Sequence, residues 1–449
     1  MTLRSRHPAL PVTCIAFLVL MLLACGQIFG ADSLSTASRA TADSALIAQK
    51  LRATTHVQSV DPLQTTLFPA KFLLRFEQPV NHNLPANETF LQRVVVGHAG
   101  FDRPTVLVTE GYGAQYALSS GYIDELAKLF NTNLVVVEHR YFLESAPTQK
   151  AWEHLTVEQA VNDLHAIVNR LKSIYPGKWI STGISKGGQT AIYHKAWFPY
   201  DTDIAVPYVA PICKAVEDGR HEPFLRKVGT RKERVRIETV QKEILRRKSQ
   251  LLPLFTEYCK QRKYNFRVPL QEVYDLSVLE YSFSTWQWGS PISQIPPTTA
   301  SDQELFDHWM KISDPDYFKA GDYFDPFFVQ AAREIGYYGY STKSFRKYLT
   351  RSNIENYLPR VFLNEDQWFP FEKEAYNRVK KYLRKEDPKM IFVYGENDPW
   401  TAAGIRVPRR KEEMMRAEMP GGSHRTRINS LPEPLKTEVI QKISGWLSE

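Results

Sequence analysis

The sequence predicts an α/β protein in which one sheet domain is interrupted by a largely helical cap. Up to about residue 212, short apolar strand patterns alternate with helical patterns, which is typical of a parallel sheet with right-handed crossovers. The alternation stops over residues 213–386 and returns for residues 387–449. We therefore expect residues 63–212 and 387–449 to form the sheet domain and residues 213–386 to form the cap.

Each predicted element rests on a local pattern. Thr156 begins a capping box, the apolar residues of Val157–Leu171 recur at helical spacing, and Pro176-Gly177 ends this helix. A tight turn at Gly183–Gly187 leads into a helix that ends near Trp197, and a last amphipathic helix spans about Pro434–Leu447. The predicted strands are short and apolar: Phe72–Phe76, Phe90–Val96, Thr105–Thr109, Leu134–Glu138, Trp179–Thr182, Ile204–Val209 and Lys389–Tyr394.

The N-terminus has the pattern of an export signal. Arg4 and Arg6 precede an apolar run, Val12–Ala24, that is short for a membrane span but suits a signal peptide. Two cleavage sites remain open: a lipoprotein box that leaves a lipidated Cys25, or ordinary cleavage after Gly30. We expect residues 1–30 to be removed or lipidated, and the protein to be periplasmic, secreted or an outer-membrane lipoprotein of a bacterium. A membrane partner is expected only through that lipid anchor.

Residues 31–62 are rich in Ala, Ser and Thr and predict a tether with a short helix at Ala45–Arg52. The chain carries a formal charge of +8, and the basic excess gathers in Arg220–Lys248. Glu233, Glu238 and Glu243 are interleaved there at helical spacing, so we interpret the segment as a solvated helix face and expect no nucleic-acid partner.

Four cysteines are present, of which Cys213 and Cys259 fall in the folded region. An oxidising compartment allows them to pair, and two buried free thiols are the alternative. No Cys/His spacing indicates a metal site, and we expect no metal and no cofactor.

The strongest chemical motif is Gly183-Ile184-Ser185-Lys186-Gly187, a G-x-S-x-G between a predicted strand and a predicted helix. In the α/β-hydrolase fold this turn exposes a serine nucleophile, and small flanking residues allow the turn to form. The alternative is a plain glycine-rich turn. We predict that Ser185 is the nucleophile of an α/β-hydrolase.

A serine nucleophile needs a base and an orienting carboxylate, which follow in the order Ser, acid, His in this fold. Asp398 comes directly after a predicted strand, and His424 lies in a glycine-rich loop before the last helix. Glu396 competes with Asp398 for the role of the acid. His139 follows an early strand, and as a base it would break the chain order.

An oxyanion hole needs two backbone donors. We expect one from Lys186, directly after the nucleophile, and the other from the loop after Thr105–Thr109, at Gly111 or Tyr112. Glu110 in the same loop is unneeded in an esterase, but its carboxylate suits a peptidase that holds the free α-amino group of a substrate.

Several segments resemble the secreted prolyl tri/tetrapeptidyl aminopeptidases and, more distantly, the prolyl carboxypeptidase and dipeptidyl peptidase group. The resemblance begins near residue 70, extends to the end of the chain, and rests on segments in a fixed order: Phe76–His82, Thr109–Tyr112, Glu138–Phe142, Leu155–Ala160, Gly183–Gly188 and Phe327–Tyr340. It implies a serine exopeptidase that removes short peptides from free N-termini, preferring proline before the cut, with Ser185, Asp398 and His424 at the triad positions. Asn81 departs from the family pattern, where an Asp is expected.

The proline preference comes from the resemblance alone. Trp286, Trp288 and Tyr337 are candidates for an apolar proline pocket, although aromatic runs more often form plain core. Glu334 is a second candidate partner for a substrate amine, with a helix-surface salt bridge as the alternative. We interpret Glu138-His139-Arg140-Tyr141 as a structural charged cluster.

Two other functions remain open. An exported esterase or lipase of the same fold would favour short acyl esters over peptides. A binding protein with an inactive site would leave Ser185 unreactive.

Overall fold

The computed structural model describes residues 43–321, 323–351 and 353–449. The signal segment, and with it Cys25, lies outside these residues. The chain divides into two compact units, Met1–Ala53 and Thr54–Glu449. In the first unit, residues 43–52 form a helix, which includes the predicted Ala45–Arg52. Within the described residues, every helix is too short or too polar to cross a membrane.

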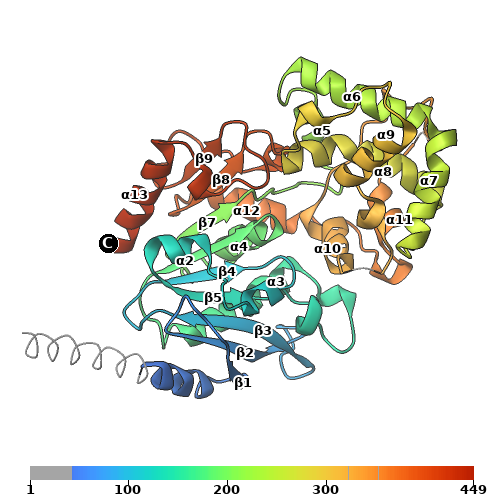
Figure 1. Ribbon diagram of the computed structural model, residues 1–449. Helices are drawn as coiled ribbons and strands as arrows, with labels where there is room; N and C mark the ends of the chain where they lie inside the picture. Colours follow the sequence, from blue (N-terminus) through green and yellow to red (C-terminus); the bar gives the residue numbers. More distant parts are fainter. Residues whose placement is uncertain (1–42, 322, 352) are drawn as a thin grey trace, which may run out of the picture. The chain divides into compact units, whose positions relative to one another are not determined.

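The second unit is built on a nine-stranded sheet with the order β1-β2-β3-β5-β4-β6-β7-β8-β9 (Figure 1). Strands β4 to β9 are parallel to one another, whereas β1, β2 and β3 join the edge in antiparallel pairs. The strands are β1 (Val57–Pro62), β2 (Ala70–Pro79), β3 (Thr89–His98), β4 (Thr105–Thr109), β5 (Asn133–Val137), β6 (Trp179–Ile184), β7 (Ile204–Tyr208), β8 (Ile391–Gly395) and β9 (Met415–Met419).

This strand order is that of an α/β-hydrolase sheet with one additional edge strand, β1. Seven of the strands match the predicted segments, and two do not. The predicted tether over residues 31–62 is wrong at its end, because Val57–Pro62 pairs with β2. In β1 only Val60 is buried, and in β9 only Ala417, so neither edge strand carries the apolar run that marks the central strands.

Helices cover both faces of the sheet. One apolar core joins the sheet to α3 (Val157–Leu171), α4 (Lys186–Trp197) and α12 (Glu374–Lys385). The core on the other face includes α2 (Glu125–Phe130) and α13 (Leu435–Ser448). The central strands are apolar on both sides because both of their faces are buried.

The cap is helical, as the sequence predicts, and follows β7 (Figure 1). Its predicted end at residue 386 is too late, because α12 packs against α4 beside the sheet. An amphipathic pattern predicts a helix but does not identify the surface that its apolar side covers. The cap helices are α5 (His221–Leu225), α6 (Arg231–Arg246), α7 (Lys248–Gln261), α8 (Leu270–Trp288), α9 (Asp302–Ile312), α10 (Asp325–Gln330) and α11 (Tyr357–Phe362).

The structure decides between the alternatives for the cysteines and shows how the basic segment is paired. Cys213 and Cys259 are both buried free thiols. In the basic segment, Glu243 pairs with Arg246 and Arg247, and Glu238 pairs with Lys242 one turn along α6. The basic excess is therefore partly neutralised along the helix itself.

Candidate active site

The turn between β6 and α4 holds Ser185 in a conformation that non-glycine residues rarely adopt, with φ 58° and ψ −119°. The flanking glycines permit this turn because they leave no room for a side chain. A Cβ on Gly183 would lie 2.4 Å from the carbonyl carbon of Gly187, and one on Gly187 would lie 2.7 Å from the carbonyl oxygen of Thr109. The end of β4 thus crosses directly against the turn, and Ser185 is half-buried beside it.

Asp398 and His424 come from loops after β8 and β9, at the same carboxyl edge of the sheet that carries Ser185. The Nδ1 atom of His424 lies 2.7 Å from Oδ2 of Asp398, and both side chains are buried. The carboxylate of Glu396 instead accepts a hydrogen bond from the Gly421 amide. Asp398 is therefore the acid that contacts the histidine.

The cap also contacts the loop after β9 that carries His424, which we call the histidine loop. The His424 amide donates to the carbonyl oxygen of Gln287, in the last turn of α8, at 2.8 Å. The Trp288 ring lies nearly perpendicular to the His424 ring with a centroid distance of 5.8 Å, and 46% of Trp288 is exposed. Trp288 thus lies beside the histidine with a free aromatic surface.

The loop after β4 carries the other predicted oxyanion donors. The Gly111 amide lies close enough to the Glu110 carboxylate to lower its pKa, which makes Tyr112 the better-placed of the two predicted donors. The carbonyl oxygen of Tyr112 accepts from the His139 amide at 3.1 Å. Buried Glu138 accepts from the Ala114 amide at 2.8 Å. The charged segment after β5 therefore supports this loop.

The rest of that segment is structural, in agreement with its interpretation from the sequence. Arg140 makes two hydrogen bonds of 2.7 Å to Asp163, and Arg93 pairs with Glu138 at 2.7 Å. Nδ1 of His139 lies 2.8 Å from the carbonyl oxygen of Arg140. Burial and the nearby Lys186 lower the pKa of His139.

Glu110 lies half-buried where the loop leaves β4. The hydroxyl of Tyr116 donates a short hydrogen bond to its carboxylate. Burial raises the pKa of Glu110 to about 7, although Tyr116, the Gly111 amide and Lys186 act in the opposite direction. The carboxylate is thus poorly compensated, which is typical of functional carboxyl groups.

Glu334, the other predicted amine partner, is buried and makes no salt bridge with any residue that the structure describes. Its carboxylate accepts from the Val157 amide at 2.6 Å, at the start of α3. Burial raises its pKa to about 7. This position gives Glu334 the role of capping α3, since anionic groups stabilise the first turn of a helix.

Two of the three predicted pocket aromatics are buried. Trp286 is 5% exposed. Tyr337 is 2% exposed, stacks on Tyr338 at 4.2 Å and lies edge-on to Trp400 at 5.5 Å. Only Trp288 presents an open surface near His424.

Sequence reasoning missed a group of cap aromatic residues that packs on the loop after β4. This loop, Glu110–Gly113, is called the oxyanion loop below. The ring of Tyr112 contacts Phe324 and Phe327 at centroid distances of 5.8 and 5.7 Å. The Tyr323 hydroxyl accepts a hydrogen bond from the Gly113 amide at 2.7 Å. Tyr323 and Phe324 are each 37% exposed, so they offer apolar surface beside the loop. The dense aromatic run that begins at Tyr323 is the signal that could have identified them.

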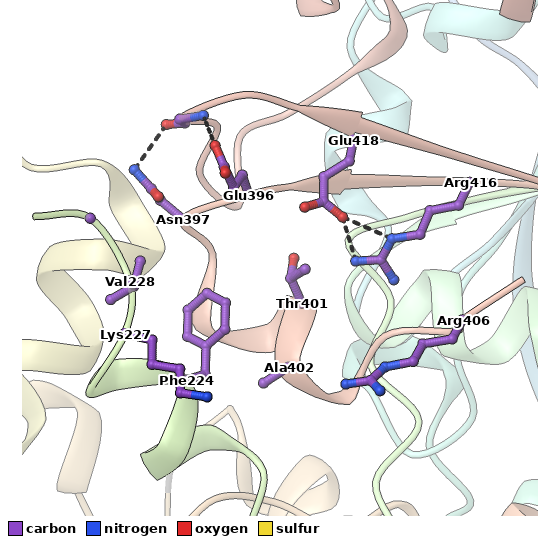
Figure 2. A pocket seen from close by; sticks show the side chains of 12 residues that line it. Phe224, Lys227, Val228, Glu396, Asn397, Thr401, Ala402, Arg406, Arg416 and Glu418 are labelled. Atoms are coloured by element: carbon purple, nitrogen blue, oxygen red, sulfur yellow. Dashed lines mark hydrogen bonds and ion pairs between the residues drawn. The ribbon is translucent and has the colours of Figure 1, made fainter.

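A cleft of about 750 Å³ also borders the loops that carry Asp398 and His424 (Figure 2). The cap contributes Phe224, Lys227 and Val228, and the sheet domain contributes the loop that begins at Glu396. Arg416 forms an ion pair with Glu418 across one wall, as Figure 2 shows. The cleft has both charged and apolar walls and lies between the cap and the sheet domain.

The sequence matches the family model described as PS-10 peptidase S37 over residues 57–448. It is 30% identical over 383 residues to the prolyl tri/tetrapeptidyl aminopeptidase of Streptomyces mobaraensis, covering 83% of this chain and 79% of that protein. It is 31% identical over 157 residues to the lysosomal Pro-X carboxypeptidase of Mus musculus, covering 31% of this chain and 32% of that protein.

Solved structures with a similar arrangement are distant. One is a proline iminopeptidase from Mycobacterium smegmatis, with 13% identity, a TM-score of 0.38, and coverage of 83% of this chain and 99% of that one. Another is a probable hydrolytic enzyme from Pseudomonas aeruginosa, with 11% identity, a TM-score of 0.37, and coverage of 85% and 96%. The family match spans nearly the whole sheet-and-cap unit, and the chain therefore belongs to the peptidase S37 family and is a serine peptidase.

Proposed function

We propose that this protein is an exported exopeptidase that releases tri- or tetrapeptides from free N-termini and cuts after proline. The observation that carries the proposal is the half-buried carboxylate of Glu110, on the loop that crosses against the Ser185 turn. Lys186 and Tyr116 offset the burial of Glu110 only in part, and a substrate ammonium group there supplies further positive charge. The name of the Streptomyces relative supports the peptide length and the proline preference.

The chemistry follows the acyl-transfer scheme of a serine hydrolase. The Ser185 hydroxyl attacks the carbonyl carbon of the scissile bond and gives its proton to Nε2 of His424. Asp398 orients the imidazole through Nδ1 and stabilises its charged form. His424 then passes the proton to the leaving amine, and a water molecule hydrolyses the acyl-enzyme by the same route in reverse.

The oxyanion of the tetrahedral intermediate requires donors beside Ser185. The Lys186 amide is one, since the first amides of a helix have no partner within the helix. The Tyr112 amide is the other. The exposed rings of Trp288, Tyr323 and Phe324 supply apolar surface that suits a proline ring, because such rings pack well on aromatic faces.

Cleavage of a matched substrate pair tests the role of Glu110. The substrates are Ala-Ala-Pro linked to a chromogenic amine, with a free or an acylated N-terminus. We expect the wild type to favour the free form by about 100-fold in kcat/KM, and Glu110→Gln to remove most of that preference. The variant changes only the charge of the side chain, so it keeps its shape.

Glu222→Gln is the matched control, because it removes a carboxylate from the cap helix α5 without touching the site. It is expected to keep the wild-type preference. Equal cleavage of the free and acylated substrates by the wild type would contradict amine anchoring. Faster turnover of short acyl esters than of either peptide would favour the esterase alternative. If the protein cleaves neither substrate class and a fluorophosphonate does not label Ser185, an inactive binding protein is favoured.

We also propose export, with Cys25 as a lipidated first residue. The basic and apolar pattern before Cys25 supports this assignment. Expression of the full chain and of Cys25→Ser in a bacterial host, followed by fractionation, tests it. Membrane association that Cys25→Ser abolishes is the expected result, and equal distribution of the two proteins would favour ordinary cleavage.

A further inference from the structure

Lys186 follows the nucleophile and carries its ammonium group into the protein interior. Its side chain is 3% exposed. Its Nζ donates to the carbonyl oxygen of Gly111 at 2.7 Å and otherwise faces the rings of Tyr112 and Phe142, at 5.7 and 5.4 Å from their centroids. Within the described residues, no carboxylate forms an ion pair with it. Burying a cation in this way is costly, and burial lowers the pKa of Lys186 well below its usual range.

The carbonyl oxygen that accepts this hydrogen bond belongs to the peptide group between Gly111 and Tyr112. The carbonyl of Gly111 and the amide N–H of Tyr112 are the two ends of one planar peptide unit. Within the described residues the one cis bond is Glu433-Pro434, so this unit is trans and its two ends point in opposite directions. A carbonyl held by Nζ of Lys186 therefore turns the Tyr112 N–H away from the Lys186 side chain.

The neighbouring amides of the loop interact with other groups. The Gly111 amide lies close enough to the Glu110 carboxylate to lower its pKa, and the Gly113 amide donates a hydrogen bond to the Tyr323 hydroxyl. The Tyr112 amide donates no backbone hydrogen bond within residues 43–321, 323–351 and 353–449. In this loop, Tyr112 is thus the amide that remains available to a substrate.

Building on the proposed function, we infer that Lys186 is a positioning residue for the oxyanion hole. Its main-chain N–H is one donor, and its side chain fixes the peptide group that carries the other. The hydrogen bond from Nζ of Lys186 to the Gly111 oxygen also polarises the peptide unit and strengthens the Tyr112 N–H as a donor. Both effects grow in importance as the substrate oxygen becomes negative, so they act on the transition state.

The backbone packing supports this arrangement. A Cβ on Gly111 would lie 2.5 Å from Cβ of Lys186 and 2.7 Å from the amide nitrogen of Gly187. The loop and the start of α4 therefore approach as closely as a glycine allows. This proximity lets a side chain on α4 reach a carbonyl oxygen of the loop.

Lys186→Met tests the inference, because methionine keeps the chain length and removes the donor. We expect kcat for Ala-Ala-Pro chromogenic substrates to fall by about 10- to 100-fold, with KM changed by less than about threefold. Lys186→Gln restores a neutral donor and is expected to recover part of the loss. A peptide boronate, which forms a tetrahedral adduct, should bind more weakly by the same factor as the loss of kcat.

Lys195→Met is the matched control, since Lys195 is a second buried lysine of α4. Its Nζ donates to the carbonyl oxygens of Pro199 and Thr202, away from the oxyanion loop. We expect Lys195→Met to lower the melting temperature while kcat of the folded enzyme stays at the wild-type value. A Lys186→Met protein that loses stability but keeps kcat would overturn the inference.

The rate at which a fluorophosphonate labels Ser185 separates this inference from the proposed function. Labelling passes through a charged pentacoordinate phosphorus and needs no peptide specificity. If the wild type is labelled but cleaves no peptide, the proposed function fails while slower labelling of Lys186→Met still supports the role of Lys186. If the wild type cleaves the peptide and Lys186→Met is labelled equally fast, the role of Lys186 fails alone.

Discussion

The raised pKa of Glu110 gives its proposed role a pH signature. The carboxyl group titrates at about 7 in the folded protein, and a peptide α-amino group titrates near 8. Binding needs the carboxylate and the ammonium form together. The ratio of kcat/KM for the free to the acylated substrate should therefore rise through pH 7 and fall above pH 8.

This ratio cancels the titration of the triad, which both substrates share. Glu110→Gln is expected to flatten the ratio across pH 5 to 9. A wild-type ratio that does not change with pH would contradict the role of Glu110 in amine binding.

The same pKa predicts a stability effect of known sign. A carboxyl group whose pKa is raised by folding stabilises the fold below its unfolded pKa of 4.5, and this contribution is lost as the pH rises through about 7. Because Glu110 is only half-buried, the effect is on the order of 1 kcal/mol. Thermal unfolding at pH 5 and 8 should show Glu110→Gln gaining stability relative to the wild type at the higher pH.

Among the elements, the turn from β6 to α4 tolerates the least change. A Cβ on Gly183 meets backbone atoms of Gly187 and Thr109 within 2.6 Å, and backbone cannot rotate away as a side chain can. Gly183→Ala is therefore expected to cost about 3 kcal/mol or more and to displace Ser185. Fluorophosphonate labelling should slow by at least about 100-fold.

Gly445→Ala is the contrasting variant. Gly445 lies within α13 and has open space around it. Alanine there favours the helix by about 0.5–1 kcal/mol, so this variant should unfold at a higher temperature with unchanged labelling. If Gly183→Ala unfolds and labels like the wild type, the steric account of the turn is wrong.

Elements with a strong local pattern could be predicted from the sequence, and elements defined by their neighbours could not. The strand Thr105–Thr109 matches the structure residue for residue, and the predicted helix begins at Val157 as expected but ends at Leu171, before the predicted stop at Pro176-Gly177. The edge strands β1 and β9 escaped prediction because each buries only one residue and lacks the apolar run of the central strands. The end of the cap was misplaced because α12 packs on α4, and no local signal records that contact.

The same division holds for the candidate site. Asp398 and His424 stand out because a strand precedes the first and a glycine-rich loop surrounds the second. Tyr323 and Phe324 did not stand out, since their importance comes from contact with Gly113 and Tyr112 respectively, about 210 residues earlier in the chain. The aromatic residues that the sequence did emphasise, Trp286 and Tyr337, are buried in the apolar core.

At the level of the whole molecule, the sheet and the cap share the site. The sheet domain carries Ser185, Asp398, His424 and Glu110. The cap places Gln287 and Trp288 on the histidine loop and Tyr323 on the oxyanion loop. A site enclosed in this way favours chain ends over folded segments, which agrees with the proposed exopeptidase.

Mass spectrometry of the peptides released from one substrate tests the central claim most directly. The substrate is a longer peptide with a free N-terminus and a single proline at its third position, given to the wild type and to Ser185→Ala in parallel. The wild type is predicted to release the N-terminal tripeptide, and Ser185→Ala to leave the substrate intact. Cleavage at any other bond, or release of the tripeptide by Ser185→Ala, would contradict the account.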